Sequence, residues 1–118
     1  MITALILNTF FLLTPLERPE IVVSQSFVEA RHNVKAKGKA GEQGAFQVLP
    51  NEWGKVPKTW KKQADQNERI MNELIQENKG DIQKSISGYN SYKNKKKGKV
   101  YLAKVRKHAI SVYILDVA

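Results

Sequence analysis

The stretch from Asp65 to Gly80 constrains the fold most strongly, because its apolar residues recur at the spacing of an α-helix. The positions that share one helical face are Ile70, Met71, Leu74 and Ile75. Asp65 with Glu68 three residues on resembles a capping box, and Gly80 predicts the end of the helix. A one-sided apolar face is stable only when other elements cover it, so the rest of the chain must supply them.

Three further segments predict helices that can cover this face. Pro19 with Glu20 is typical of a first helical turn, and we expect a helix over about 19–31. Asp81 predicts the cap of a helix that begins at Ile82, and the spacing after Val100 predicts a last helix with an ambiguous β-branched tail over 110–117. The glycine-rich stretch 33–44 and the lysine-rich stretch 89–99 are expected to be loops.

No repeat and no linker long enough to separate two domains interrupts this pattern. We therefore expect one mainly α domain over residues 1–118, with a small β-sheet or none. Residues 1–18 form an N-terminal apolar segment whose first 13 residues are almost all apolar. They are too few to span a bilayer, and no basic region precedes them as in a signal peptide. We expect a buried first element here, with docking of residues 1–13 to a membrane or another protein as the alternative.

The net charge of +9 comes from one third of the chain. Residues 1–81 hold 11 basic and 10 acidic side chains, whereas residues 82–115 hold 9 basic and no acidic ones. Such an excess predicts an anionic partner, which is a nucleic acid, a membrane surface or an acidic polymer such as cell wall. The absence of cysteine excludes thiolate catalysis and Cys-ligated metal sites.

The common catalytic motifs are absent from the sequence. It has no P-loop, no GxGxxG dinucleotide motif, no HExxH zinc motif and no GxSxG nucleophile elbow. His32 and His108 each lack an acid or a second histidine at ligand spacing, so neither predicts a metal ligand or a general base. We expect no cofactor and no metal.

Several short patterns follow one another in a definite order along the chain. They are Gln25-Ser26-Phe27, the segment GEQGAFQVLP over 41–50, Asn67 with Ile70, Gly80-Asp81-Ile82, Tyr89-Asn90-Ser91, and Tyr101 with Val105. In this order and spacing, from Ile21 to Arg106, they resemble the soluble lytic transglycosylases, the goose-type-lysozyme-like enzymes of glycoside hydrolase family 23. That family shows a Glu-Ser pair ending a helix, a Gly-x-x-Gln-[Val/Ile]-x-Pro segment and a Tyr-Asn pair.

The resemblance implies a lysozyme-like fold, with residues 19–107 as the family-like core, and an activity. Enzymes of this family cleave the β-1,4 bond between N-acetylmuramic acid and N-acetylglucosamine in peptidoglycan and leave a 1,6-anhydro product. One Glu serves as acid and then as base, so a second carboxylate is not required, unlike in most glycosidases. The implied partner is the peptidoglycan glycan strand, and the implied location is the periplasm, the cell envelope or a phage virion.

Gln25 stands where the resemblance places the catalytic Glu, directly before Ser26. Cleavage requires a group that protonates the leaving oxygen, and an amide cannot do so. If Gln25 is aligned with the catalytic Glu in this way, the chain is expected to bind glycan and to cut it very slowly or not at all. Gln25 then marks either an engineered substrate trap or a natural non-catalytic binding or scaffold protein of the same fold. A different register is the remaining alternative, with Glu20, Glu29 or Glu42 as the acid; Glu29 lies one helical turn from Gln25.

The other positions that match the family pattern are implied to contact the substrate. They are Ser26, Gln47, Tyr89, Asn90 and Tyr101. For Ser26 the alternative is a hydroxyl that bonds to its own helix. Phe46, Trp53 and Trp60 are expected to pack, at least partly, in the core.

A run of lysines follows the Tyr89-Asn90 pair. Its members are Lys93, Lys95, Lys96, Lys97 and Lys99. The run predicts either a solvated loop or a basic edge that holds the anionic strands of cell wall. A nucleic-acid partner is less favoured, because no helix-turn-helix, RNP-type or zinc-finger pattern accompanies the lysines.

Overall fold

The computed structural model describes residues 16–91 and 95–117 of the chain. The apolar segment at residues 1–13 and Lys93 therefore lie outside the described residues, and for Lys95 and Lys96 the backbone alone is described. The helices are α2 (Pro19–Ala30), α3 (Pro50–Trp53), α4 (Trp60–Glu77), α5 (Ile82–Ser91) and α6 (Lys95–Val117). Within the described ranges, β-structure is limited to isolated bridges that join Gln43 to Lys37 and to Val48. The prediction of a mainly α fold is confirmed.

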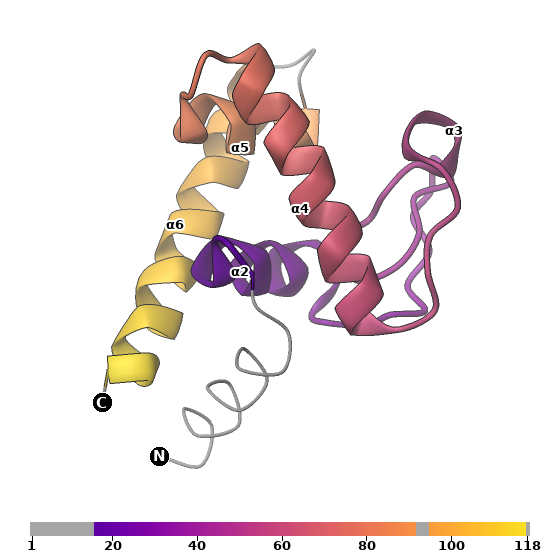
Figure 1. The fold of residues 1–118 in the computed structure, drawn as a ribbon, viewed down its shortest axis with the longest axis horizontal. Coiled ribbons are helices and arrows are strands. Elements are labelled where there is room, and N and C mark those ends of the chain that lie inside the picture. The colour runs from indigo at the N-terminus through magenta and orange to yellow at the C-terminus, as the bar shows by residue number, and fades with distance from the viewer. Residues whose placement is uncertain (1–15, 92–94, 118) are drawn as a thin grey trace.

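The long helix α6 packs along both α2 and α5, and α4 packs against α5 and α2. Figure 1 shows α2 between α6 and α4, while the segment that carries α3 lies on the far side of α4 from α6. The helical face predicted from the spacing of Ile70 and Met71 is buried against these neighbours, as expected. Segments distant in the sequence thus meet around the centre of the molecule.

The core has two adjoining clusters of buried residues. One is made by Val22, Ala45, Phe46, Val48, Ala64 and Ile70. The other is made by Met71, Ile86, Tyr101 and Val105. Leu74 and Tyr89 pack against both clusters and join them. Phe46 is buried and the two tryptophans pack partly buried against the first cluster, which confirms their predicted packing roles.

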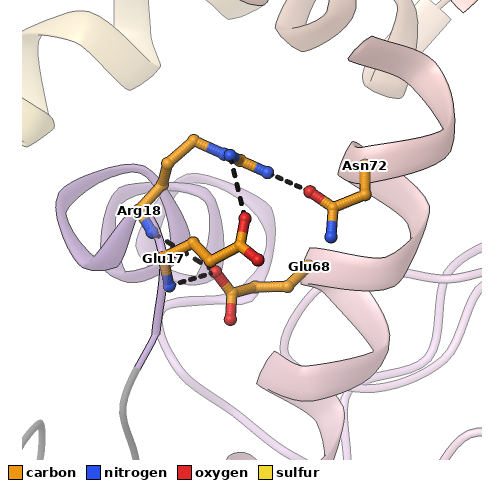
Figure 2. Close-up of polar contacts among 4 residues, drawn as sticks. All are labelled: Glu17, Arg18, Glu68 and Asn72. Carbon is orange, nitrogen blue, oxygen red and sulfur yellow. Dashed lines mark hydrogen bonds and ion pairs between the residues drawn. The ribbon is translucent and has the colours of Figure 1, made fainter. Parts of the chain in front are cut away.

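Helix α2 begins where the sequence predicts, with Pro19 in its first turn. Arg18 precedes it without a side-chain cap. The carboxylate of Glu68 on α4 instead binds the chain directly before the helix: its Oε2 accepts hydrogen bonds from the backbone N–H of Glu17 at 2.8 Å and of Arg18 at 3.3 Å (Figure 2). The Arg18 guanidinium in turn donates to Asn72 of α4. A negative group at a helix N-terminus is stabilising, so α4 fixes where α2 starts.

The predicted start of α4 is wrong. The helix begins at Trp60, because Thr59 is extended and its hydroxyl caps the first turn by accepting from the N–H of Lys62 at 3.3 Å. Asp65 is an exposed residue inside the helix and not its cap. By contrast, the cap predicted at Asp81 is confirmed, since its Oδ1 accepts from the N–H of Lys84 at 2.9 Å.

The predicted loop over 89–99 is wrong at both ends. Helix α5 extends to Ser91, and α6 already includes the lysine run from Lys95. Lysine is a good helix former, and Gly98 allows the two helices to approach closely. A β-carbon at Gly98 would lie 3.0 Å from the carbonyl oxygen of Ser87. The ambiguous tail over 110–117 continues α6 as helix.

Candidate active site

A cavity of about 200 Å³ lies where the end of α2 meets the loop over 40–49, α4 and α5. Its polar lining residues are Glu29, Glu42, Gln47, Glu52, Tyr89 and Asn90. Its apolar lining includes Val48, Leu49, Trp53, Ile70 and Leu74. This mixture of apolar wall and a few convergent polar groups is typical of a small-molecule site.

Glu29 lies in the last turn of α2, at the point where the chain turns sharply. Arg31 and His32 follow with φ of 49° and 66°, and their N–H groups donate to the carbonyls of Phe27 and Ser26. Burial raises the pKa of the Glu29 carboxyl from 4.5 to about 7, and the charge of Glu42 adds to the shift. The nearby Tyr101 hydroxyl acts in the opposite direction, without offsetting the effect of burial.

A pKa of about 7 means that Glu29 is protonated in a large fraction of molecules near neutral pH. General acids work best when their pKa lies near the working pH. A carboxyl group in a partly apolar cavity is the usual arrangement for proton donation to a leaving oxygen. Glu29 is therefore chemically suited to acid catalysis.

The rim of the cavity is formed by a turn that brings Gln47 and Glu42 together. Gln47 has a φ of 50° and donates from its Nε2 to the carbonyl of Gly44 at 2.9 Å. The carboxylate of Glu42 accepts the N–H of Ala40 at 2.7 Å and so orders the loop. A β-carbon at Gly38 would lie 2.7 Å from the side chains of both Gln47 and Glu42, which explains the glycine there.

Tyr89 connects this rim to α5. Its hydroxyl donates a 2.7 Å hydrogen bond to the carbonyl of Phe46, the residue before Gln47. Burial and the charge of Glu29 raise the pKa of Tyr89, so the phenol remains a neutral donor. Asn90 follows on α5, exposed, and lines the same cavity. Of the predicted substrate contacts, Gln47, Tyr89 and Asn90 are therefore gathered around Glu29.

Gln25 does not reach this cavity. Its side chain is fully buried between α4 and α6, where its Nε2 donates to the Met71 sulfur at 3.6 Å and its Oε1 has no hydrogen-bond partner. It lines none of the described cavities, in contrast to the role predicted for it. Of the three register alternatives, Glu29 and Glu42 both line the cavity, and burial raises the pKa of the Glu29 carboxyl. The third alternative, Glu20, lines no described cavity.

Ser26 is also fully buried and is not among the lining residues of this cavity. Its hydroxyl pairs with Nδ1 of His32 at 2.7 Å and accepts from Nε1 of Trp60 at 2.7 Å. Ser26 lines none of the described cavities, and its hydroxyl bonds His32 and Trp60 instead of a backbone group of its own helix. The cluster instead fixes the turn that follows Glu29.

Tyr101 is 4% exposed, so it offers little surface on which a sugar could stack. Its ring lies parallel to that of Tyr89 at a centroid distance of 6.3 Å. Burial raises the pKa of Tyr101, and the charges of Glu29 and Tyr89 add to the shift, so its hydroxyl is also neutral. Tyr101 acts on the Glu29 carboxyl from the buried side of the site.

A second cavity of about 500 Å³ adjoins Glu29 on the side of α6. Its lining residues are Val28, Glu29, Asn90, Lys97, Val100, Tyr101 and Lys104. Glu29 and Asn90 line both cavities, so the two hollows adjoin on either side of these residues. Lys97 from the predicted basic edge lines it, whereas Lys99 lines none of the described cavities.

Several residues of the site were not predicted from the sequence. Glu52 and Trp53 enter the cavity from α3, and Leu74 from α4. Gln63 holds the rim from below: its buried amide accepts the N–H of Ala45 at 2.8 Å and donates to two loop carbonyls, at 2.7 and 3.1 Å. Nothing in the local sequence around Gln63 signals this role, because its partners come from two separate loops, one before and one after α3.

Searches of protein-family models, curated proteins and solved structures find no match to this chain. Within the part of the chain that the structure describes, no three histidine or acidic side chains are grouped closely enough to hold a metal ion. The same part holds no helix of the length and apolarity needed to cross a membrane.

Proposed function

We propose that this chain is a peptidoglycan-cleaving enzyme of the lytic transglycosylase type, with Glu29 as its catalytic acid and base. The observation that carries the proposal is the environment of Glu29: a largely buried carboxyl with a pKa near 7, in a cavity with Gln47, Tyr89 and Asn90. These three positions are the ones for which the sequence resemblance implies substrate contact. The proposal therefore combines the raised pKa of Glu29 with the positions that the sequence resemblance singles out.

In this mechanism, protonated Glu29 donates its proton to the glycosidic oxygen as the bond to the muramic acid breaks. The resulting carboxylate then takes a proton from the muramic acid 6-hydroxyl, which closes the 1,6-anhydro ring. Gln47 and Asn90 offer amide donors and acceptors to the N-acetyl groups of the sugars. The reaction needs one carboxylate that exchanges a proton, and a pKa near 7 makes both forms of Glu29 accessible.

The non-catalytic alternative is a glycan-binding or scaffold protein, and it depended on Gln25 as the residue in the acid position. Gln25 is fully buried against Met71 and lines none of the described cavities, so on this proposal its amide does not replace the proton donor. On the present proposal, the chain with Gln25 is active as it stands, and its glutamine belongs to the core.

The test is to incubate the purified chain with peptidoglycan sacculi and to follow turbidity and the masses of the soluble products. We expect clearing and 1,6-anhydromuropeptides. Ordinary reducing ends would show a hydrolase instead, and no clearing would contradict an enzymatic role. The variant Gln25→Glu serves as the comparison. If activity were found in this variant alone, residue 25 and not Glu29 would be the position of the catalytic acid.

A further inference from the structure

The two hollows that meet at Glu29 carry opposite charge. The hollow under the 40–49 loop is lined by the carboxylates of Glu42 and Glu52 in addition to Glu29, and no basic side chain is among its described lining residues. The hollow on the α6 side is lined by Lys97 and Lys104. A third hollow, of about 550 Å³, continues from Glu29 past Arg31, Lys104 and Lys107. The charged side chains that line the hollows are thus acidic on one side of Glu29 and basic on the other.

This asymmetry is large enough to orient a substrate with unevenly placed charge. Lys97 and Lys104 are both exposed and lie seven residues apart on α6. Seven residues correspond to two helical turns, so the two residues lie on the same side of the helix, with their backbones about 10 Å apart along its axis. That spacing suits an extended substituent with more than one carboxylate better than a single compact anion.

We propose that Lys97 and Lys104 bind carboxylates of the peptide substituent on muramic acid, and so fix the direction in which the glycan lies across Glu29. The proposal rests on the proposed function and names a part of the substrate that the lysines recognise. In peptidoglycan, the muramic acid residues carry acidic peptides, whereas the N-acetylglucosamine residues are neutral. The hollow lined by Glu42 and Glu52 repels such carboxylates, which disfavours the reversed direction.

The experiment measures binding in a Glu29→Gln background, so that the substrate is not consumed. Two probes are used: soluble glycan-peptide fragments released from sacculi by sonication, and the same fragments with their carboxylates converted to methylamides. Adding Lys97→Met and Lys104→Met is expected to weaken binding of the free-carboxylate fragments about fivefold at low salt and to leave binding of the blocked fragments unchanged. The arginine pair Lys97→Arg and Lys104→Arg should retain the affinity of the parent.

The matched control is the pair Lys61→Met and Lys62→Met, which removes the same charge from the exposed first turn of α4. Neither residue lines a described hollow beside Glu29, so we expect no specific loss. Equal weakening for both probes, or none for either, would overturn the role of Lys97 and Lys104 while the parent still binds. A parent that binds neither probe would instead contradict the proposed function itself.

Discussion

The hydroxyl of Tyr89 donates a 2.7 Å hydrogen bond to the carbonyl of Phe46. This contact joins α5 to the turn that carries Gln47, across 43 residues of sequence. It fixes the distance between two walls of the cavity, with Glu29 facing both. The candidate site thus depends on a few long-range polar contacts that hold its walls in place.

Removing this contact is expected to loosen the site. Tyr89→Phe leaves the Phe46 carbonyl without its donor, and we expect the free energy of unfolding to fall by about 1–2 kcal/mol. The rate of sacculi clearing should fall as well, because Gln47 is no longer held in position. Tyr101→Phe is the matched control for stability: its hydroxyl, unlike that of Tyr89, bonds no backbone carbonyl, so chemical denaturation should show a smaller loss. Equal destabilisation by both variants would contradict this assignment.

The alkaline limb of the activity profile is expected to report the pKa of Glu29. Activity requires the protonated acid, so kcat/KM should fall as the pH rises through about 7. Glu42→Gln removes a nearby negative charge and should move this limb to lower pH. Tyr101→Phe removes a hydroxyl that favours the charged carboxyl and should move the limb to higher pH. Shifts in the same direction, or none, would contradict Glu29 as the titrating group.

Gln63 is expected to be the most sensitive polar residue beneath the rim. Its amide bonds Ala45, Val34 and Pro57, so Gln63→Ala leaves a buried donor and two carbonyls unpaired and opens a cavity. We expect a loss of about 2–4 kcal/mol in urea denaturation. Gln76→Ala on the exposed part of the same helix is the control, with an expected effect within about 0.5 kcal/mol. A small loss at Gln63 would show that the loops close without it.

The raised pKa of Glu29 also predicts how stability depends on pH. The folded carboxyl holds its proton up to about pH 7, whereas the unfolded one releases it near 4.5, so Glu29 contributes no penalty below pH 4.5. Between these values stability is lost as the pH rises, up to about 3 kcal/mol at about 1.4 kcal/mol per unit. Glu29→Gln should therefore be more stable than the parent at about pH 8 and similar at about pH 4. Thermal denaturation at both pH values measures this difference.

Local signals predicted much of the fold. The start of α2 follows from Pro19 and Glu20, and the start of α5 from Asp81, because each signal acts within one turn of the chain. The start of α4 was mispredicted because the Asp65 pattern resembled a cap while the true cap, Thr59, lay six residues earlier. The helical conformation of the lysine run was missed because a polar run that contains Gly98 resembles a loop in sequence, although lysine itself is a good helix former.

The sequence also did not distinguish the surroundings of Gln25 from those of Glu29, for a similar reason. Gln25 and Glu29 lie one turn apart on the same helix, and the weak amphipathic pattern of α2 does not distinguish their surroundings. Their surroundings differ in the folded chain. Gln25 packs against Met71 of α4, whereas Glu29, at the end of α2, lines the cavity. Both relationships arise only when the helices assemble.

The most direct measurement of the central claim is the rate at which Glu29→Gln clears peptidoglycan sacculi, compared with the parent chain at about pH 6. The variant keeps the size and hydrogen-bonding capacity of the side chain and removes proton transfer. We predict a rate about 10²- to 10⁴-fold lower than that of the parent, with intact folding and retained binding to sacculi. A variant that clears sacculi as fast as the parent would contradict the assignment of Glu29 as the catalytic acid.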